Sequence, residues 1–162
     1  MALIFADSTC AICGERLDRP YTATSGCAFP EAHPLWRYCD APLHLDCLER
    51  WPQRGQFSRG YFDAAVEQRR SGYGHLLAQG ETWVLVCGPH VEDNTPYFAE
   101  VRLPDWPFRL YSKWGDWPYF IGGGYREGLE GAALSAADKV MAEVREIAPD
   151  GPALMRLLRA AT

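Results

Sequence analysis

Two short pairs of metal-binding side chains stand out in the first third of the chain. Cys10 and Cys13 form a Cys-x-x-Cys knuckle in "CAIC", and His44 and Cys47 form a His-x-x-Cys pair in "HLDC". The turn of a knuckle points both thiolates inward, whereas residues i and i+3 of a helix share one face. The positive N-terminal end of a helix also favours a thiolate. Two such pairs together form the closed tetrahedral ligand set that structural zinc prefers.

The sequence alone leaves other roles open for the cysteines and histidines. A lone Cys-x-x-Cys motif can be a redox pair, but "STCAICGERL" lacks the thioredoxin-like strand and helix that such a pair needs. Single cysteines are usually small buried hydrophobes, and Cys27 taken alone fits that role best. His33 and His75 have no paired neighbour and are expected to be loop or surface histidines. A third pair, Cys87 and His90 in "CGPH", follows a predicted strand.

The stretch "CDAPLHLDCLERW" resembles the middle of a RING finger. That family has Cys-x-His-x-x-His-x-x-Cys-Leu-x-x-Trp there, with Cys-x-x-Cys upstream and Cys-Pro-x-Cys downstream. The residues that fit this spacing are Cys10, Cys13, Cys39, His44, Cys47, Leu48 and Trp51. The resemblance covers residues 10–51 and 87–90, and it implies a small RING-like or treble-clef zinc finger.

The resemblance also implies how the ligands are shared between ions. In a RING finger the first and third pairs hold one zinc ion, and the second and fourth pairs hold the other. The first ion would then be bound by Cys10, Cys13, His44 and Cys47. The second would be bound by Cys39, Cys87 and His90. Ala41 stands where the family has the fourth ligand of this second ion, so Cys27, or His33 in its place, has to complete the set. We therefore predict one zinc ion and, with Cys27 as the eighth ligand, a second.

Several secondary-structure elements must position these pairs. Residues 1–10 are predicted to form a first strand, and residues 44–51 a short helix that Pro52 ends. Helical spacing of apolar residues predicts a longer helix over about 61–70. Further along, the sequence predicts a β-rich run over 81–90, a strand over 97–103, and helices over about 136–148 and 152–161.

Two later features bear on what is buried. Apolar and charged residues alternate over 97–103, so Glu100 and Arg102 should point away from the buried face of a half-buried strand. Trp106 and Trp117 belong to two similar segments, "DWPF" and "DWPY". They could form a partner surface, because tryptophan is common at interface hot spots. We favour the alternative, that they cover the core.

The elements together predict an α+β fold. A zinc-stabilised module over residues 1–92 would contain a helical insertion at about 52–82. A strand-and-helix part over residues 93–162 would follow and pack on it. With 48% apolar and 13% aromatic residues the chain can bury a core of this size.

Composition narrows the class of protein. The formal net charge is −5 and the pI is near 5.3. These values argue against a general nucleic-acid-binding protein, because such proteins need a basic surface. No apolar run approaches the roughly 18 residues of a membrane span. The N-terminus lacks the basic region of a signal peptide. We therefore predict a cytoplasmic protein, whose thiols stay reduced and available for metal. The excess of arginine over lysine favours a bacterial source.

Function is predicted from the closed zinc site. Four protein ligands leave no open position for water, and no Ser-His-Asp, His-Glu-x-x-His or paired-carboxylate pattern is evident. We predict a protein-interaction or adaptor protein without catalytic activity, whose partner is another protein.

Two enzyme classes remain as alternatives. The RING resemblance implies a ubiquitin-ligase-like protein in which Ile12, Trp51 and Pro89 would dock a conjugating enzyme. Val91 follows the last pair, where active ligases often have a basic residue. A treble-clef nuclease is a weaker alternative, because it needs a histidine beside an open metal site and the chain is acidic.

Overall fold

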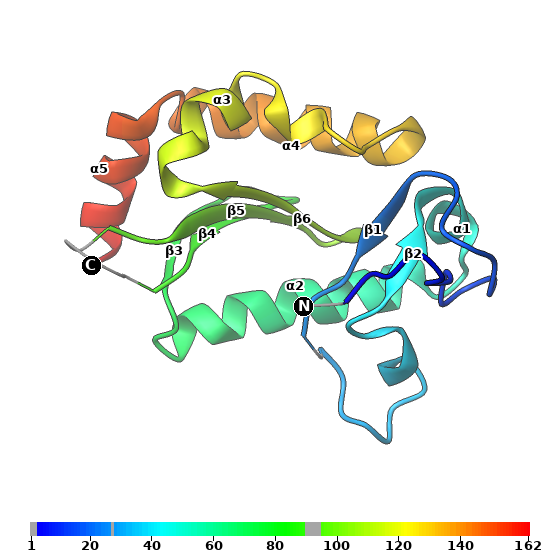
Figure 1. The fold of residues 1–162 in the computed structure, drawn as a ribbon. Helices are drawn as coiled ribbons and strands as arrows, with labels where there is room; N and C mark the ends of the chain where they lie inside the picture. The colour runs from blue at the N-terminus through cyan, green and yellow to red at the C-terminus, as the bar shows by residue number, and fades with distance from the viewer. Residues whose placement is uncertain (1–2, 27, 90–94) are drawn as a thin grey trace.

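The computed structural model describes residues 3–26, 28–89 and 95–162, and it shows a four-stranded antiparallel sheet with helices on both faces and a smaller N-terminal lobe at one end (Figure 1). The strands are β1 (Tyr21–Ala23), β2 (Pro42–His44), β3 (His75–Gln79), β4 (Val84–Cys87), β5 (Phe98–Leu103) and β6 (Trp106–Lys113). The helices are α1 (Leu45–Arg50), α2 (Arg54–Arg70), α3 (Trp117–Ile121), α4 (Gly131–Ile147) and α5 (Gly151–Ala161). The prediction of a mixed helix-and-strand fold is confirmed.

The larger sheet is a meander, because its strands follow one another in the order β3-β4-β5-β6 and each pairs with the next. Helix α2 lies along one face of this sheet, and α3 and α4 lie over the other face (Figure 1). Helix α5 packs beside β3. The Trp117 indole donates a hydrogen bond to the Ala148 carbonyl at 2.9 Å, which ties α3 to the end of α4.

The N-terminal lobe (residues 3–53) contains β1, β2 and α1. Strands β1 and β2 pair in antiparallel register, with Tyr21 opposite His44. The predicted strand over residues 1–10 is wrong for its described part, since residues 3–8 lie outside any strand and Thr9 makes only an isolated bridge to Arg16. The predicted helix over 44–51 is confirmed as α1.

Helix α2 is longer than predicted and connects the lobe to the sheet. It begins at Arg54 rather than near residue 61. Phe57, on its first turns, packs against the rings of Trp51 at 5.3 Å and Phe29 at 5.8 Å. The Tyr61 hydroxyl donates to the Gly26 carbonyl at 2.6 Å. These contacts override the low helix propensity of the glycine-containing start of α2.

Both faces of β5 are buried, which corrects the half-buried strand predicted over 97–103. The alternation of side chains is present, but Glu100 and Arg102 lie under α2 rather than in solvent. Trp106 and Trp117 are also buried, which confirms the core interpretation of the two "DWP" segments.

The predicted boundary between residues 92 and 93 falls inside the connection between β4 and β5, which are hydrogen-bonded neighbours. The predicted C-terminal helices are confirmed, although α4 begins earlier, at Gly131. Strand β3 was not predicted. None of the helices in the described ranges is long and apolar enough to cross a membrane.

Gly74 allows the chain to turn from α2 into β3. It has a φ of +86°, and a side chain there would collide with the Cys87 carbonyl of the neighbouring strand. Gly72 has a similar φ of +89° but open space around it. Gly72→Ala should therefore cost only the left-handed strain, about 1–2 kcal/mol.

Gly74→Ala should cost clearly more, because the strain and the collision add. Urea denaturation of the two variants and the wild type measures both costs. Equal losses of unfolding free energy would show that the strand yields to the added methyl group.

Candidate metal centre

Four of the predicted ligands converge in the N-terminal lobe. The ligand atoms of Cys10, Cys13, His44 and Cys47 all lie within 4.8 Å of one another. This is the one group of three or more histidine, cysteine or carboxylate side chains with metal-site geometry among residues 3–26, 28–89 and 95–162. The four residues can therefore bind a metal ion, as the spacing of the two pairs predicts.

Short-range hydrogen bonds shape the knuckle that carries the first pair. The Gly14 amide donates to the Cys10 carbonyl and the Cys10 amide donates to the Glu15 carbonyl, both at 2.8 Å. Gly14 has a φ of +78°, which a glycine adopts without strain. The Ala11 amide donates to the Pro42 carbonyl at 3.0 Å, so the knuckle is held against β2.

The second pair lies where β2 meets α1. His44 is the last residue of β2, and Cys47 lies on the first turn of α1. The Leu45 amide donates to the Pro20 carbonyl at 3.0 Å, which fixes this junction to the chain just before β1. His44 and Cys47 are both buried, so two strands and a helix hold the pair facing the knuckle.

The hydrogen bonds of His44 fix its tautomer. Its Nε2 lies 3.0 Å from the Arg16 carbonyl oxygen, which can only accept, so Nε2 carries the proton. The Nδ1 lone pair then faces the thiols, 3.5 Å from the Cys13 Sγ and 3.9 Å from the Cys47 Sγ. A backbone carbonyl in this position orients metal-binding histidines in many proteins.

Backbone amides surround the Cys10 sulfur. The His44 amide donates to the Cys10 Sγ at 3.3 Å. Burial alone would raise the pKa of the Cys10 thiol, but hydrogen bonds from the backbone of Cys13, His44 and Ile12 hold it below its ordinary value. The site therefore stabilises the thiolate that a metal requires.

Arg19 supplies a positive charge beside the other two sulfurs. Its Nη2 lies 3.5 Å from the Cys47 Sγ and 3.9 Å from the Cys13 Sγ. Its Nε donates to the Asp46 carboxylate at 3.0 Å, and this hydrogen bond lowers the pKa of Asp46 to about 2. Burial and the Cys13 thiol raise the pKa of Cys47 to about 11, so a metal ion has to displace its proton.

The spacing of the ligand atoms fits a tetrahedral ion. Zinc bonds of about 2.3 Å to sulfur and about 2.0–2.1 Å to nitrogen give tetrahedral edges of roughly 3.5–3.8 Å. The two sulfur–nitrogen distances are 3.5 and 3.9 Å, close to this range, and all four ligand atoms lie within 4.8 Å of one another. Three thiolates and a neutral imidazole around a divalent cation carry one net negative charge, which Arg19 is placed to balance.

Arg19→Met should weaken metal binding without removing a ligand. Partners of metal ligands typically contribute about 10–100-fold in metal affinity, so we expect a loss in this range. Competition with a coloured chelator measures the affinity. Arg50→Met is the matched control, because Arg50 also pairs with Asp46 but is exposed and, in the described part of the chain, donates to none of the ligand sulfurs. Equal losses in both variants would assign the effect to Asp46 instead of the sulfurs.

The structure does not bring Cys39 and Cys87 together. Cys39 follows a short 3-10 turn (Trp36–Tyr38) and interacts with the Tyr61 hydroxyl, near the start of α2. Cys87 ends β4, and its carbonyl lies against Gly74, beyond the other end of α2. The helix from Tyr61 to Arg70 rises about 1.5 Å per residue, so the two thiols lie far apart.

The remaining predicted ligands of a second ion are not placed at a metal site. Cys27 and His90 lie outside the described residues. His33 stacks on Phe29 at 4.7 Å, and its Nδ1 accepts the Leu35 amide at 3.1 Å. The second ion therefore stays a prediction.

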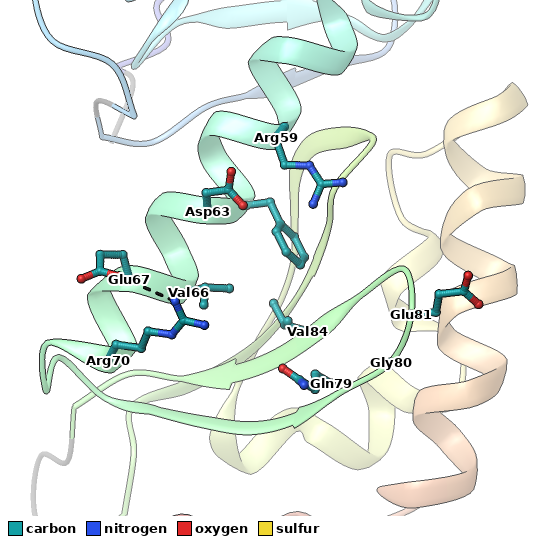
Figure 2. Close-up of a pocket in the computed structure, with 10 residues that line it drawn as sticks. Arg59, Asp63, Val66, Glu67, Arg70, Gln79, Gly80, Glu81 and Val84 are labelled. Carbon is teal, nitrogen blue, oxygen red and sulfur yellow. Dashed lines mark ion pairs between the residues drawn. The ribbon is translucent and has the colours of Figure 1, made fainter.

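The largest concave features lie away from the four ligands. One cavity of about 440 Å³ lies between α2 and the β3–β4 hairpin (Figure 2). Arg59, Asp63 and Arg70 line it from α2, with Gln79 and Val84 on the hairpin side. Glu67 pairs with Arg70 at 4.0 Å on the exposed side of the helix. The carboxylates that line this cavity, those of Asp63, Glu67 and Glu81, point to different places, so they form neither a metal site nor a general acid–base pair.

Arg19 is a contributor to the site that its sequence context does not predict. Its spacing of four residues from Glu15 indicates an ion pair, and the two do meet at 3.0 Å. Nothing in that spacing points to the sulfurs, because Cys47 comes 28 residues later and reaches Arg19 only through the fold.

Comparison of the chain with protein-family models, with curated proteins and with solved structures finds no match.

Proposed function

We propose that Cys10, Cys13, His44 and Cys47 hold one structural zinc ion and that the chain is a protein-interaction or adaptor protein without catalytic activity. The observation that carries this proposal is the closed ligand set. Three thiols and one imidazole fill all four tetrahedral positions, and three of the four residues are buried. A zinc ion held in this way has no open position for water or substrate, so it stabilises the fold instead of catalysing a reaction.

The order of elements supports a RING-like or treble-clef lobe. A knuckle carrying two ligands is followed by a strand pair, and the second ligand pair lies where that strand pair meets a helix. The same order underlies the resemblance of the sequence to RING fingers. The type of zinc finger is part of the proposal.

Exposed apolar side chains on the lobe support an interaction role. Among residues 3–26 and 28–36, the exposed large hydrophobic side chains are Leu3, Ile4, Phe5, Tyr21 and Trp36. Exposed apolar groups of this kind are common at protein-binding surfaces. The partner that fits them is a protein with an apolar patch of its own.

Metal identity is tested by replacing the native ion with cobalt. Co²⁺ bound to three thiolates and one imidazole in a tetrahedron gives strong visible absorption and a sulfur-to-cobalt charge-transfer band. Elemental analysis of protein purified without added metal should give about one zinc per chain. A six-coordinate cobalt spectrum, or iron in place of zinc, would contradict the proposed site.

The interaction surface is tested by photo-crosslinking. A photoreactive phenylalanine analogue at Phe5, which is 64% exposed, should crosslink a protein partner in cells of the source organism. Tyr119 is 66% exposed and lies on α3, outside the lobe, so it is the matched control. Equal crosslinking from both positions, or none from Phe5, would remove the support for this surface.

The ubiquitin-ligase alternative has less support from the geometry. Docking by the RING resemblance needs Ile12, Trp51 and Pro89 on one surface. The Trp51 ring instead packs 4.6 Å from Tyr38, and Pro89 follows β4, whose end lies against Gly74 beyond the far end of α2. A ubiquitin discharge assay with a broad panel of conjugating enzymes separates the two functions, since discharge by the wild type and not by Ile12→Ala would favour the ligase.

A further inference from the structure

A buried group of charges lies between α2 and the sheet. The Glu100 side chain, on β5, is 1% exposed and meets three arginines. Arg69 of α2 approaches its Oε1 at 3.4 Å, and Arg102 of the same strand approaches Oε1 at 3.1 Å. Arg109 of β6 pairs with Oε2. We call these four residues the arginine cluster.

The arginine cluster has too little negative charge. Three guanidinium groups stay protonated in proteins, so with one carboxylate the cluster has a net charge of +2. Within the described parts of the chain, no other carboxylate lies within 4.0 Å of these guanidinium groups. Burial lowers the pKa of both Arg69 and Arg102, which reflects the cost of holding unbalanced charge away from water.

Hydrogen bonding in the arginine cluster is also incomplete. The Arg69 side chain is only 3% exposed, and its Nε has no acceptor among the residues that the structure describes. A buried donor without a partner is rare in folded proteins and is destabilising, more so when it is charged. An additional group with negative charge beside the cluster would offset its excess positive charge.

A cavity adjoins the cluster on the α2 side. It has a volume of about 50 Å³ and lies between α2 and the loop before residue 27, with Arg102, Gln68, Tyr61 and Ser25 in its lining. Arg102 lines the cavity directly, and Arg69 lies behind its Gln68 wall, where the Gln68 Oε1 accepts a hydrogen bond from the Arg69 Nη1 at 3.1 Å. Since one water needs about 10–15 Å³ by this measure, the cavity has room for a few waters or for one small anion.

We propose that this cavity binds a small tetrahedral oxyanion, inorganic phosphate or sulfate, at Arg102, with the charge of Arg69 close behind Gln68. Guanidinium forks match the oxygen geometry of such anions, and charge-assisted hydrogen bonds are the strongest in proteins. A dianion brings the net charge of the cluster from +2 to zero. The small volume favours the free ion over a phosphoryl group that belongs to a larger molecule.

Isothermal titration with inorganic phosphate tests the proposal at constant ionic strength, with chloride as the reference anion. We expect saturable binding of one phosphate per chain and little binding of methyl phosphate, which has an extra group to place. Methyl phosphate binding as tightly as phosphate would instead point to a phosphorylated ligand. No saturable phosphate binding by the wild-type protein would overturn the proposal without any mutation.

Two variants locate the ion. Arg102→Gln should lower phosphate affinity at least tenfold, whereas Arg70→Gln, which removes an exposed arginine of α2, should leave it unchanged. Gln68→Glu is a second test that does not depend on whether Arg102→Gln folds. Position 68 is exposed, so the change should not disturb the core, and the new carboxylate would occupy the place of the anion. Gln68→Glu should therefore bind phosphate at least tenfold more weakly while melting no lower than the wild type. Wild-type affinity in both Arg102→Gln and Gln68→Glu would place the anion elsewhere.

Discussion

Replacing Cys47 with serine should release the metal ion and unfold the N-terminal lobe. Serine is a poor zinc ligand, so the tetrahedral set would lose one of its four members. Structural zinc supplies about 10–16 kcal/mol of apparent binding free energy. Because that is comparable to the stability of a whole domain, about 5–15 kcal/mol, the lobe should not stay folded without it. Elemental analysis and circular dichroism during heating measure the two effects.

Cys39→Ser is the matched control for this change. Cys39 lies in the same lobe but outside the group of four ligands. This variant should keep its metal and a melting temperature close to that of the wild type. A soluble Cys47→Ser protein with unchanged melting would contradict a structural role for the ion. Two zinc ions in the wild type, falling to one in Cys39→Ser, would instead restore the interleaved arrangement that the RING resemblance implies.

Glu100→Gln should be the most destabilising single change outside the metal centre. It removes the carboxylate that pairs with three guanidinium groups, of which Arg69 and Arg102 are buried and Arg109 is partly exposed. Breaking a buried ion pair from one side costs about 3–5 kcal/mol. For a chain of this length each kcal/mol shifts the melting temperature by about 2–4 °C, so a fall of roughly 6–20 °C is expected. Glu67→Gln is the control, since Glu67 is exposed and its ion pair with Arg70 is long.

The pH dependence of stability gives an independent measurement. Burial would raise the pKa of Glu100, but the charges of Arg102 and Arg109 outweigh it and hold the pKa below its ordinary value. Its contribution is therefore present above the pKa of an unfolded glutamate and is lost as the pH falls through the lower folded value. Below that value the wild type and Glu100→Gln should converge in unfolding free energy. A difference that persists at low pH would mean that the glutamine disturbs packing rather than charge.

The four ligands could be predicted from the sequence because the geometry of each pair is local. A knuckle turn brings Cys10 next to Cys13, and one turn of helix brings His44 next to Cys47. Residues 14–41 connect the two pairs, and the pairing of β1 with β2 and the hydrogen bond from the Ala11 amide to the Pro42 carbonyl bring the knuckle back beside β2. The second predicted set depends on Cys39 and Cys87, which are connected through α2 and β3. The length of α2 fixes the distance between these two cysteines. The predicted helix, over about 61–70, included only the second half of α2.

The buried charges could not be predicted for a related reason. Alternation in β5 correctly assigns Glu100 and Arg102 to one face of the strand. Whether that face meets water depends on what covers it, and α2 reaches it from a distant part of the sequence. Charged residues are rarely buried, so their residue types also favoured the incorrect prediction that Glu100 and Arg102 face solvent. The start of α2 was missed because its glycines have low helix propensity, while the aromatic contacts of Phe57 that stabilise it are tertiary.

The sharing of α2 by the lobe and the sheet limits how this protein can be recombined. Its first turns contribute Phe57 and Tyr61 to the lobe, and its last turns contribute Arg69 to the buried charges of the sheet. If the chain were divided anywhere along this helix, both fragments would expose aromatic or charged side chains that are buried in the whole protein. We therefore expect that the lobe does not fold on its own, unlike the independent zinc-binding modules of tandem arrays. Insertions and fusions should be tolerated in the exposed turn at residues 80–82 far better than between residues 54 and 70.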